Sequence, residues 1–212
     1  AMWIGLVGSE MCIRDRNIAM YVSEVAFWTH RALWQLLFSG KFDKFPGLKY
    51  CVVECGSWWV GDLLWKADVN FGASWKIKKM SSRMKGLLTK LPSEYFGDSV
   101  FIGASTMSRY EIRERHRNGI DALMWGTDYP HPEGSWPNTV HRLENDFQDV
   151  SIEDTRRLLG LNAIECYNLD VEGLTTVANR IGPTPEKLNQ DPALRTSPTA
   201  KRDARWWFDE YG

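Results

Sequence analysis

Several features that define common protein classes are missing from this sequence of 212 residues. It has no apolar run of the roughly 18 residues that a membrane-spanning helix needs, so we expect no membrane partner. Its formal net charge of −1 provides no strongly basic surface, so we expect no nucleic acid partner either. Four cysteines are too few and too scattered for a disulfide framework, which predicts a reduced, cytoplasmic protein.

Metal-binding patterns are also missing, because the chain has neither His-x-His nor Cys-x-x-Cys and contains only four histidines. His30 and His141 adjoin arginines in predicted helices, which favours surface or helix-packing roles. His116 lies in a charged stretch that is typical of a solvated helical face. His131 differs, because the prolines on both sides restrict its loop and can direct the side chain toward a substrate. A loop histidine on the surface is the alternative.

Short apolar runs alternate with helical patterns along the middle of the chain. Strands are predicted over 48–55, 99–103 and 120–124. Helices are predicted over 23–38, 57–68, 74–90, 108–118, 138–147, 151–160 and 162–169. The first strand is almost continuously apolar, as expected for a parallel strand that is covered on both faces. The alternation therefore predicts a parallel α/β sheet or barrel.

The two ends of the chain differ from its middle. Residues 1–16 resemble the conceptual translation of a sequencing adapter, so we expect the native chain to begin near Asn17; a short amphipathic start is the alternative. From Val171 to residue 212 the sequence is rich in proline, threonine, asparagine and charge, and it ends in Trp206-Trp207-Phe208. We interpret 171–212 as an extended tail that packs back or docks on a neighbour, and 17–170 as the folded domain. Three strands do not close a barrel, so part of one is expected.

Two carboxylates follow predicted strands. Glu54 lies at the end of the first strand, and Asp128 follows the third in a loop rich in glycine and proline. Because the carboxyl ends of parallel strands lie on one rim, we expect both side chains to face the same pocket. There they could move a proton or bind a metal. The alternative for Asp128 is a structural role, in which it caps the next turn through its own backbone.

Three segments resemble the amidohydrolase-related family, also called amidohydrolase 2, of metal-dependent hydrolases and decarboxylases. Met124 to Gly134 resembles the final barrel strand and its loop. Residues 42–49 and 54–59 resemble the segment around strand six, and Leu158 to Ala163 resembles the C-terminal Gly-x-Asn-Ala helix. The motifs occur in family order, and the resemblance covers residues 24–170.

The resemblance implies a TIM (β/α)8 barrel, with a divalent metal, most simply zinc, at its carboxyl-terminal rim. This chain would supply the C-terminal part, about strands six to eight. Asp128 matches the aspartate ligand of the last strand and would also accept a proton from the attacking water. Glu54 stands where the family has an acid/base histidine. His131, Trp58 and Trp59 are candidate substrate contacts, although both tryptophans equally fit simple packing.

The predicted function is a fragment of a metal-dependent hydrolase, in which activated water attacks a carbonyl-type small-molecule substrate. A non-oxidative carboxy-lyase of the same family is one alternative, and Glu54 in place of the histidine argues against it. The other alternative is a catalytically inactive truncated product or interaction module, because the first-strand histidines of the family have no counterpart here. A homodimer is expected by analogy alone.

Overall fold

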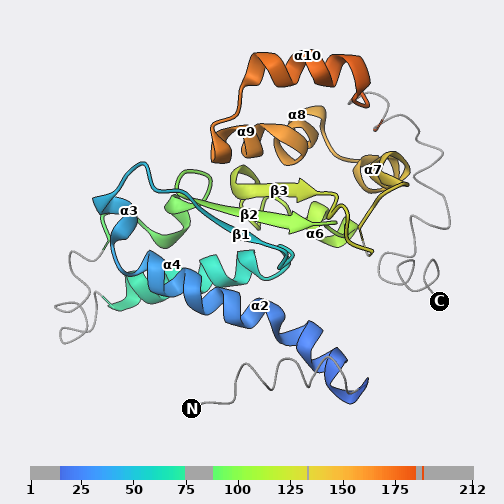
Figure 1. Cartoon of the computed structure of the whole chain (residues 1–212). Coiled ribbons are helices and arrows are strands. Elements are labelled where there is room, and N and C mark those ends of the chain that lie inside the picture. The colour runs from blue at the N-terminus through green and yellow to red at the C-terminus, as the bar shows by residue number, and fades with distance from the viewer. Residues whose placement is uncertain (1–14, 75–87, 133, 185–187, 189–212) are drawn as a thin grey trace.

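The computed structural model describes residues 15–74, 88–132, 134–184 and 188. Its centre is a parallel sheet in the order β1 (Tyr50–Val53), β2 (Val100–Ser105) and β3 (Leu123–Gly126) (Figure 1). Val52 of β1 is in register with Ile102 of β2, which is in turn in register with Leu123 of β3. The predicted parallel α/β fold is confirmed. That the sheet is the C-terminal part of a barrel stays a prediction.

The third strand begins later than its apolar run suggested. Ile120–Ala122 forms the 3-10 turn η2, which follows Gly119 in a left-handed conformation with φ 80°. The apolar side chains at the start of this run therefore contribute to the core without pairing in the sheet. The strand β3 then runs from Leu123 to Gly126 and ends two residues before Asp128.

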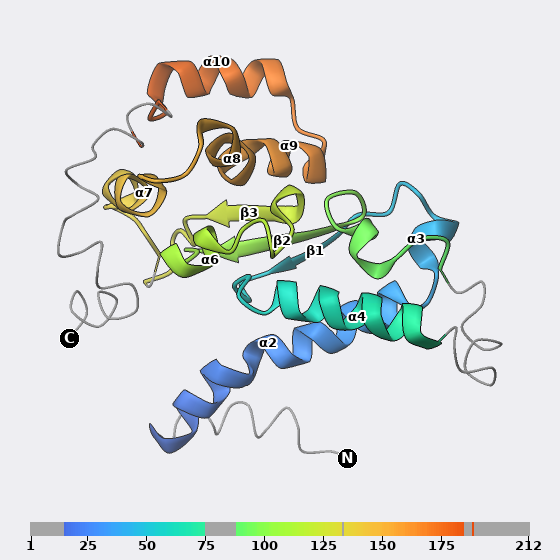
Figure 2. The same ribbon diagram turned by 180° about the vertical axis from the view of Figure 1, so that it is seen from behind.

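Helices lie on both sides of the sheet (Figures 1 and 2). On the side of β1 are α2 (Asp15–Leu37) and α4 (Val60–Ser74). On the side of β3 are α8 (Ile152–Arg156), α9 (Asn162–Tyr167) and α10 (Val171–Ile181), with α7 (Thr139–Phe147) nearby. The shorter elements are α3 (Lys41–Lys44), η1 (Pro92–Tyr95), α6 (Arg109–Arg113) and the π-helical turn η3 (Arg157–Leu161). No helix in the described ranges is both long and apolar enough to cross a membrane.

The main core lies on one face of the sheet. The strand residues Val52, Ile102 and Leu123 are buried there and pack with Leu33 and Leu37 of α2. Side chains alternate between the two faces of a strand, so the residues between these three belong to the opposite face. Burial of each large aliphatic side chain in such a core stabilises the fold by about 1.5–3 kcal/mol.

The opposite face of the sheet is covered only in part. Cys51, Phe101 and Met124 pack there against Ala163 and Cys166 of α9. Further along the same face of β1, the side chain of Val53 is 51% exposed. The helix α9 therefore covers this face over Cys51, Phe101 and Met124 and leaves it open at Val53, at the carboxyl end of β1.

The segment from Val171 corrects the sequence analysis, which predicted an extended tail there. Residues 171–181 form α10, and the Asp170 side chain caps it by accepting hydrogen bonds from the backbone N–H groups of Glu172 and Gly173, both at 3.1 Å. The glycine, threonines and nearby proline had obscured a helical spacing of apolar residues. Those residues remain exposed, so the helix forms without contributing to the core.

The other helix predictions differ mainly at their ends. The capping box at Ser108 and Glu111 is confirmed, but α6 ends at Arg113 and turns replace the predicted continuation to residue 118. The helix predicted over 57–68 begins at Val60 and runs on to Ser74. The predictions for residues 1–14, for most of 74–90 and for the aromatic end of the tail lie outside the described residues.

Candidate functional site

Each strand is followed by a residue with a left-handed backbone that is not glycine. These residues are Glu54 after β1, Thr106 after β2 and Asp128 after β3, with φ values of 58°, 46° and 60°. The N–H of Glu54 donates to the carbonyl of Gly103 at 3.0 Å, and that of Thr106 donates to Gly126 at 2.8 Å. Such conformations cost about 1–2 kcal/mol and cluster at functional sites. Together these three residues define the rim of the sheet.

The Asp128 carboxylate lies beside the imidazole of His131. Its Oδ2 is 3.5 Å from Nδ1 of His131, and its carbonyl accepts the N–H of His131 at 2.8 Å. The loop closes tightly at Gly134, where a Cβ would lie only 2.8 Å from the carbonyl oxygen of Thr127. Only glycine fits this position without a shift of the backbone. The loop thereby holds the carboxylate and the imidazole close together; that His131 is directed toward a substrate stays a prediction.

Glu54 is exposed at the opposite side of the rim from Asp128. The strands that carry the two carboxylates are separated by β2, so their backbones lie roughly 10 Å apart. At that separation the two carboxylates are not a pair that shares one proton. The structure thus places Glu54 and Asp128 on one rim; their catalytic roles remain proposals.

The two tryptophans after β1 occupy different environments. Trp58 is 53% exposed and is free to contact a small molecule at the rim. Trp59 is 4% exposed, and its indole N–H donates to the carbonyl of Cys55 at 2.8 Å. Its ring also packs on His30 of α2, with the ring centroids 3.9 Å apart. Trp59 therefore packs in the core beneath the rim, whereas Trp58 is exposed and its role as a substrate contact stays a prediction.

His30 is a residue near the site that the sequence alone did not assign there. Burial lowers the pKa of its imidazole below the ordinary value, which favours the neutral form. Its Nε2 is buried, and no hydrogen-bond partner for it lies within the described part of the chain. The sequence predicted surface or helix packing for His30, and packing is what is observed. No local pattern links it to Trp59, since the two residues come from separate elements.

A buried carboxylate joins two of the rim loops. Glu111 is 7% exposed, and its Oε2 accepts the N–H and the hydroxyl of Ser108 at 2.8 and 2.9 Å. Its Oε1 accepts the hydroxyl of Ser57 at 3.1 Å and also the backbone N–H of that residue. The sequence revealed the capping box but gave no sign of the contact with Ser57. Glu111 therefore positions the loop after β1 against the loop after β2.

A buried ion pair supports the middle of the rim. Arg142 of α7 donates from Nη2 to the carbonyl of Thr106 at 2.9 Å. Its Nε donates to the carboxylate of Asp146 at 3.2 Å, four residues along the same helix. Both side chains are almost fully buried. This contact fixes the left-handed residue after β2 to the helix that follows the Asp128 loop.

The donors on the described rim do not complete a metal centre. Among the described residues, no group of three or more histidine, cysteine, aspartate or glutamate side chains could hold an ion. Asp128 and His131 offer one carboxylate and one imidazole, whereas a catalytic zinc site uses three protein ligands. The described chain therefore fits at most part of a metal site.

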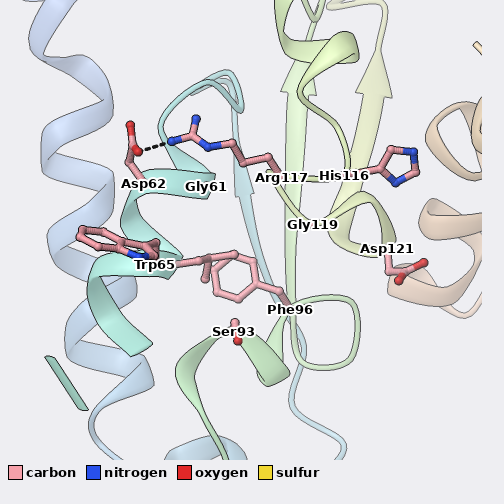
Figure 3. Close-up of a pocket in the computed structure, with 10 residues that line it drawn as sticks. Gly61, Asp62, Trp65, Ser93, Phe96, His116, Arg117, Gly119 and Asp121 are labelled. Atoms are coloured by element: carbon pink, nitrogen blue, oxygen red, sulfur yellow. Dashed lines mark hydrogen bonds and ion pairs between the residues drawn. The ribbon is translucent and has the colours of Figure 1, made fainter. Parts of the chain in front are cut away.

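A cavity of about 740 Å³ lies elsewhere, between α4, η1 and the turn that leads into β3 (Figure 3). Trp65 and Phe96 form part of its apolar wall, and Arg117 reaches across to form an ion pair with Asp62. His116, predicted to be solvated, is exposed at its edge and lies 3.1 Å from a carboxylate oxygen of Asp154. None of the three rim residues lines this cavity.

Comparison of the sequence with protein families gives the class of this protein. The chain belongs to the amidohydrolase family, because the sequence profile of that family matches residues 24–169. The family resemblance seen in the sequence is thereby confirmed. No curated protein sequence matches the chain significantly.

Two similar solved structures illustrate the relationship. One is 5-carboxyvanillate decarboxylase from Sphingomonas paucimobilis, with 24% identity and a TM-score of 0.49 over 66% of this chain and 39% of that chain. The other is an amidohydrolase from Mycobacterium avium subsp. paratuberculosis K-10, with 22% identity and a TM-score of 0.48 over 63% of this chain and 32% of that chain. The chain thus spans less than half the length of either protein.

Proposed function

We propose that residues 17–170 supply the catalytic rim, about strands six to eight of a TIM barrel, to a hydrolase that adds water to a carbonyl-type substrate. The observation that carries this proposal is the shared rim, where left-handed backbones place Glu54 and Asp128 after two strands of one parallel sheet. Active sites of (β/α)8 barrels occupy this edge. Membership of the amidohydrolase family supports the same reaction class.

In this proposal Asp128 is the base. Its carboxylate accepts a proton from the water that attacks the substrate carbonyl, and the nearby imidazole of His131 binds the substrate and stabilises the carboxylate. General base catalysis of this kind contributes about 10²–10⁴-fold to the rate. Glu54 acts from the other side of β2, as a second carboxylate facing the substrate. Exposed Trp58 provides an aromatic wall for a small molecule.

A divalent metal belongs to this proposal only in a longer parent polypeptide. Zinc is the metal we propose, and Asp128 is the single residue of this chain that we assign to it as a ligand. Because the described residues lack a third ligand, we propose that the 212-residue chain alone has no turnover. A cytoplasmic location and a homodimer complete the proposal, with no nucleic acid or membrane partner.

The test uses the longest natural polypeptide that contains residues 17–170. Asp128→Asn is compared with Glu165→Gln, a matched loss of one carboxylate on an exposed part of α9. Hydrolysis of esters and lactones and decarboxylation of aromatic acids are measured for both. We expect Asp128→Asn to lower kcat for hydrolysis by at least about 10²-fold, with an unchanged far-ultraviolet dichroism spectrum. Full hydrolytic activity in this variant would refute the proposal, and CO₂ release without hydrolysis would favour a carboxy-lyase.

A further inference from the structure

Two thiols meet on the partly covered face of the sheet, away from the proposed chemistry of the rim. Cys51 lies on β1 and Cys166 on α9, and they pack together although they are far apart in the sequence. The two side chains pack in one small cluster with Phe101 and Met124, and the hydroxyl of Tyr167 donates to Sγ of Cys51 at 3.5 Å. Both cysteines are reduced in this structure.

We propose that Cys51 and Cys166 form a reversible disulfide when the protein meets a peroxide. Cys51 is the thiol that reacts first, and Cys166 is the thiol that resolves the product. This is a modification site on the opposite side of the sheet from the main core, and it does not depend on the hydrolase proposal.

The reaction balances in two steps. The sulfur of Cys51 attacks one oxygen of hydrogen peroxide, breaks the O–O bond and becomes a sulfenic acid, while the other oxygen leaves as water. The sulfur of Cys166 then attacks the sulfenic sulfur, forms the S–S bond and releases a second water. The two thiols lose two electrons in total, and the peroxide gains them. A dithiol reductant returns both cysteines to thiols by exchange.

Their environments assign the two roles. Cys51 is half-buried, whereas Cys166 is only 7% exposed. Burial, with Cys51 alongside, raises the pKa of Cys166 to about 11, and the nearby Lys49 opposes this only weakly. The hydroxyl of Tyr167 donates to the sulfur of Cys51, and that bond, together with burial, raises the pKa of Tyr167 to about 12. The thiolate is the reactive form, so the buried Cys166 with its raised pKa is the poorer nucleophile, and the more exposed Cys51 reacts first.

Cys55 provides a matched control within the same chain. It is also half-buried and lies four residues from Cys51, but its sulfur contacts the hydroxyl of Thr29 at 3.1 Å and the carbonyl of Val53 at 3.2 Å. Neither neighbour is a thiol, so among the described residues these contacts give Cys55 no cysteine to resolve a sulfenic acid. The proposed disulfide would link α9 to β1, whereas Cys55 would remain a thiol without a disulfide.

The experiment uses the full chain with Cys12→Ser, which removes the one cysteine outside the described residues. The protein is treated with hydrogen peroxide, alkylated, digested without reductant and examined by mass spectrometry. We expect a disulfide that joins the peptides of Cys51 and Cys166, at least about tenfold above any product that contains Cys55. Cys55→Ser keeps this disulfide, and Cys51→Ser and Cys166→Ser each abolish it.

A sulfenic acid trap then separates the two roles. In Cys166→Ser, dimedone should label Cys51 after peroxide treatment, because no resolving thiol remains. In Cys51→Ser, Cys166 should stay unlabelled, with far-ultraviolet dichroism confirming that both variants fold. Labelling of Cys166 in Cys51→Ser would overturn the assigned order. Oxidation of Cys51 to sulfinic acid with Cys166 still reduced in the folded parent would overturn the disulfide itself.

Discussion

Glu111 links two loops of the rim through its buried carboxylate. Its carboxylate accepts hydrogen bonds from the backbone N–H and the hydroxyl groups of Ser57 and Ser108, and both of its oxygens are used as acceptors. A glutamine at this position would replace one oxygen by an NH₂ group that faces other donors. An unsatisfied buried donor costs about 1–3 kcal/mol.

We therefore predict that Glu111→Gln lowers the free energy of unfolding by about 1–3 kcal/mol. Urea denaturation measures this, with Glu165→Gln on exposed α9 as the control, for which a change within about 0.5 kcal/mol is expected. Equal stabilities for the two variants would show that the network around Glu111 contributes nothing beyond an ordinary surface carboxylate.

His30 gives the fold a pH dependence. Burial holds its pKa below the ordinary value of 6.5, so between that value and the folded pKa the unfolded state binds a proton that the native state does not. The free energy of unfolding therefore rises with pH over this range. The part of it that is linked to His30 is lost as the pH falls from about 6.5 through the folded pKa. His30→Phe keeps a ring against Trp59 but cannot titrate.

We predict that stability falls less in His30→Phe than in the parent when the pH is lowered from about 7.5 to about 5. Urea denaturation at both pH values gives the comparison within each protein, so a constant packing cost of the substitution cancels. Identical pH slopes in the two proteins would mean that His30 is not held in its neutral form.

Among the helices, α2 and α10 illustrate opposite relations between pattern and packing. Both carry apolar residues at helical spacing, but Leu33 of α2 is fully buried and Leu174 of α10 is exposed. The periodicity of α2 sufficed to predict a helix, because its apolar face meets the sheet. The apolar side chains of α10 meet no core, and the helix begins at the Asp170 cap. Its composition is therefore that of an exposed segment, and it suggested a tail.

The same substitution should separate these two helices. Leu33→Ala leaves a cavity in the core and is expected to cost about 2–5 kcal/mol of unfolding free energy. Leu174→Ala removes a side chain that contacts mainly solvent, and a change within about 0.5 kcal/mol is expected. Denaturant midpoints measure both. A large loss for Leu174→Ala would indicate that α10 packs on another chain in solution.

Across the whole molecule, local patterns predicted the strands and their parallel pairing, but not every contact between the elements. Apolar runs located β1, β2 and β3 to within a few residues, and parallel pairing followed from the intervening helices. The placement of Glu54 and Asp128 on one rim could be inferred from that topology. The link from Ser57 to Glu111 and the packing of His30 on a tryptophan could not, since each joins residues with no shared local pattern.

Whether the rim forms a complete metal site also depends on the whole molecule. Glu54, Thr106 and Asp128 end three strands of one sheet, yet the described residues offer too few ligands for a metal centre. A catalytic zinc site uses three protein ligands, and Asp128 is the single ligand that we assign to this chain. We therefore expect metal binding and turnover only in a longer polypeptide that supplies the other ligands.

The most direct test is zinc stoichiometry measured by elemental analysis after gel filtration, on this chain and on the longest natural polypeptide that contains residues 17–170. Our account predicts zinc and ester hydrolysis only in the longer protein, with both reduced by Asp128→Asn. Stoichiometric zinc bound to the 212-residue chain and released by Asp128→Asn would contradict it, because this chain would then possess a metal site of its own.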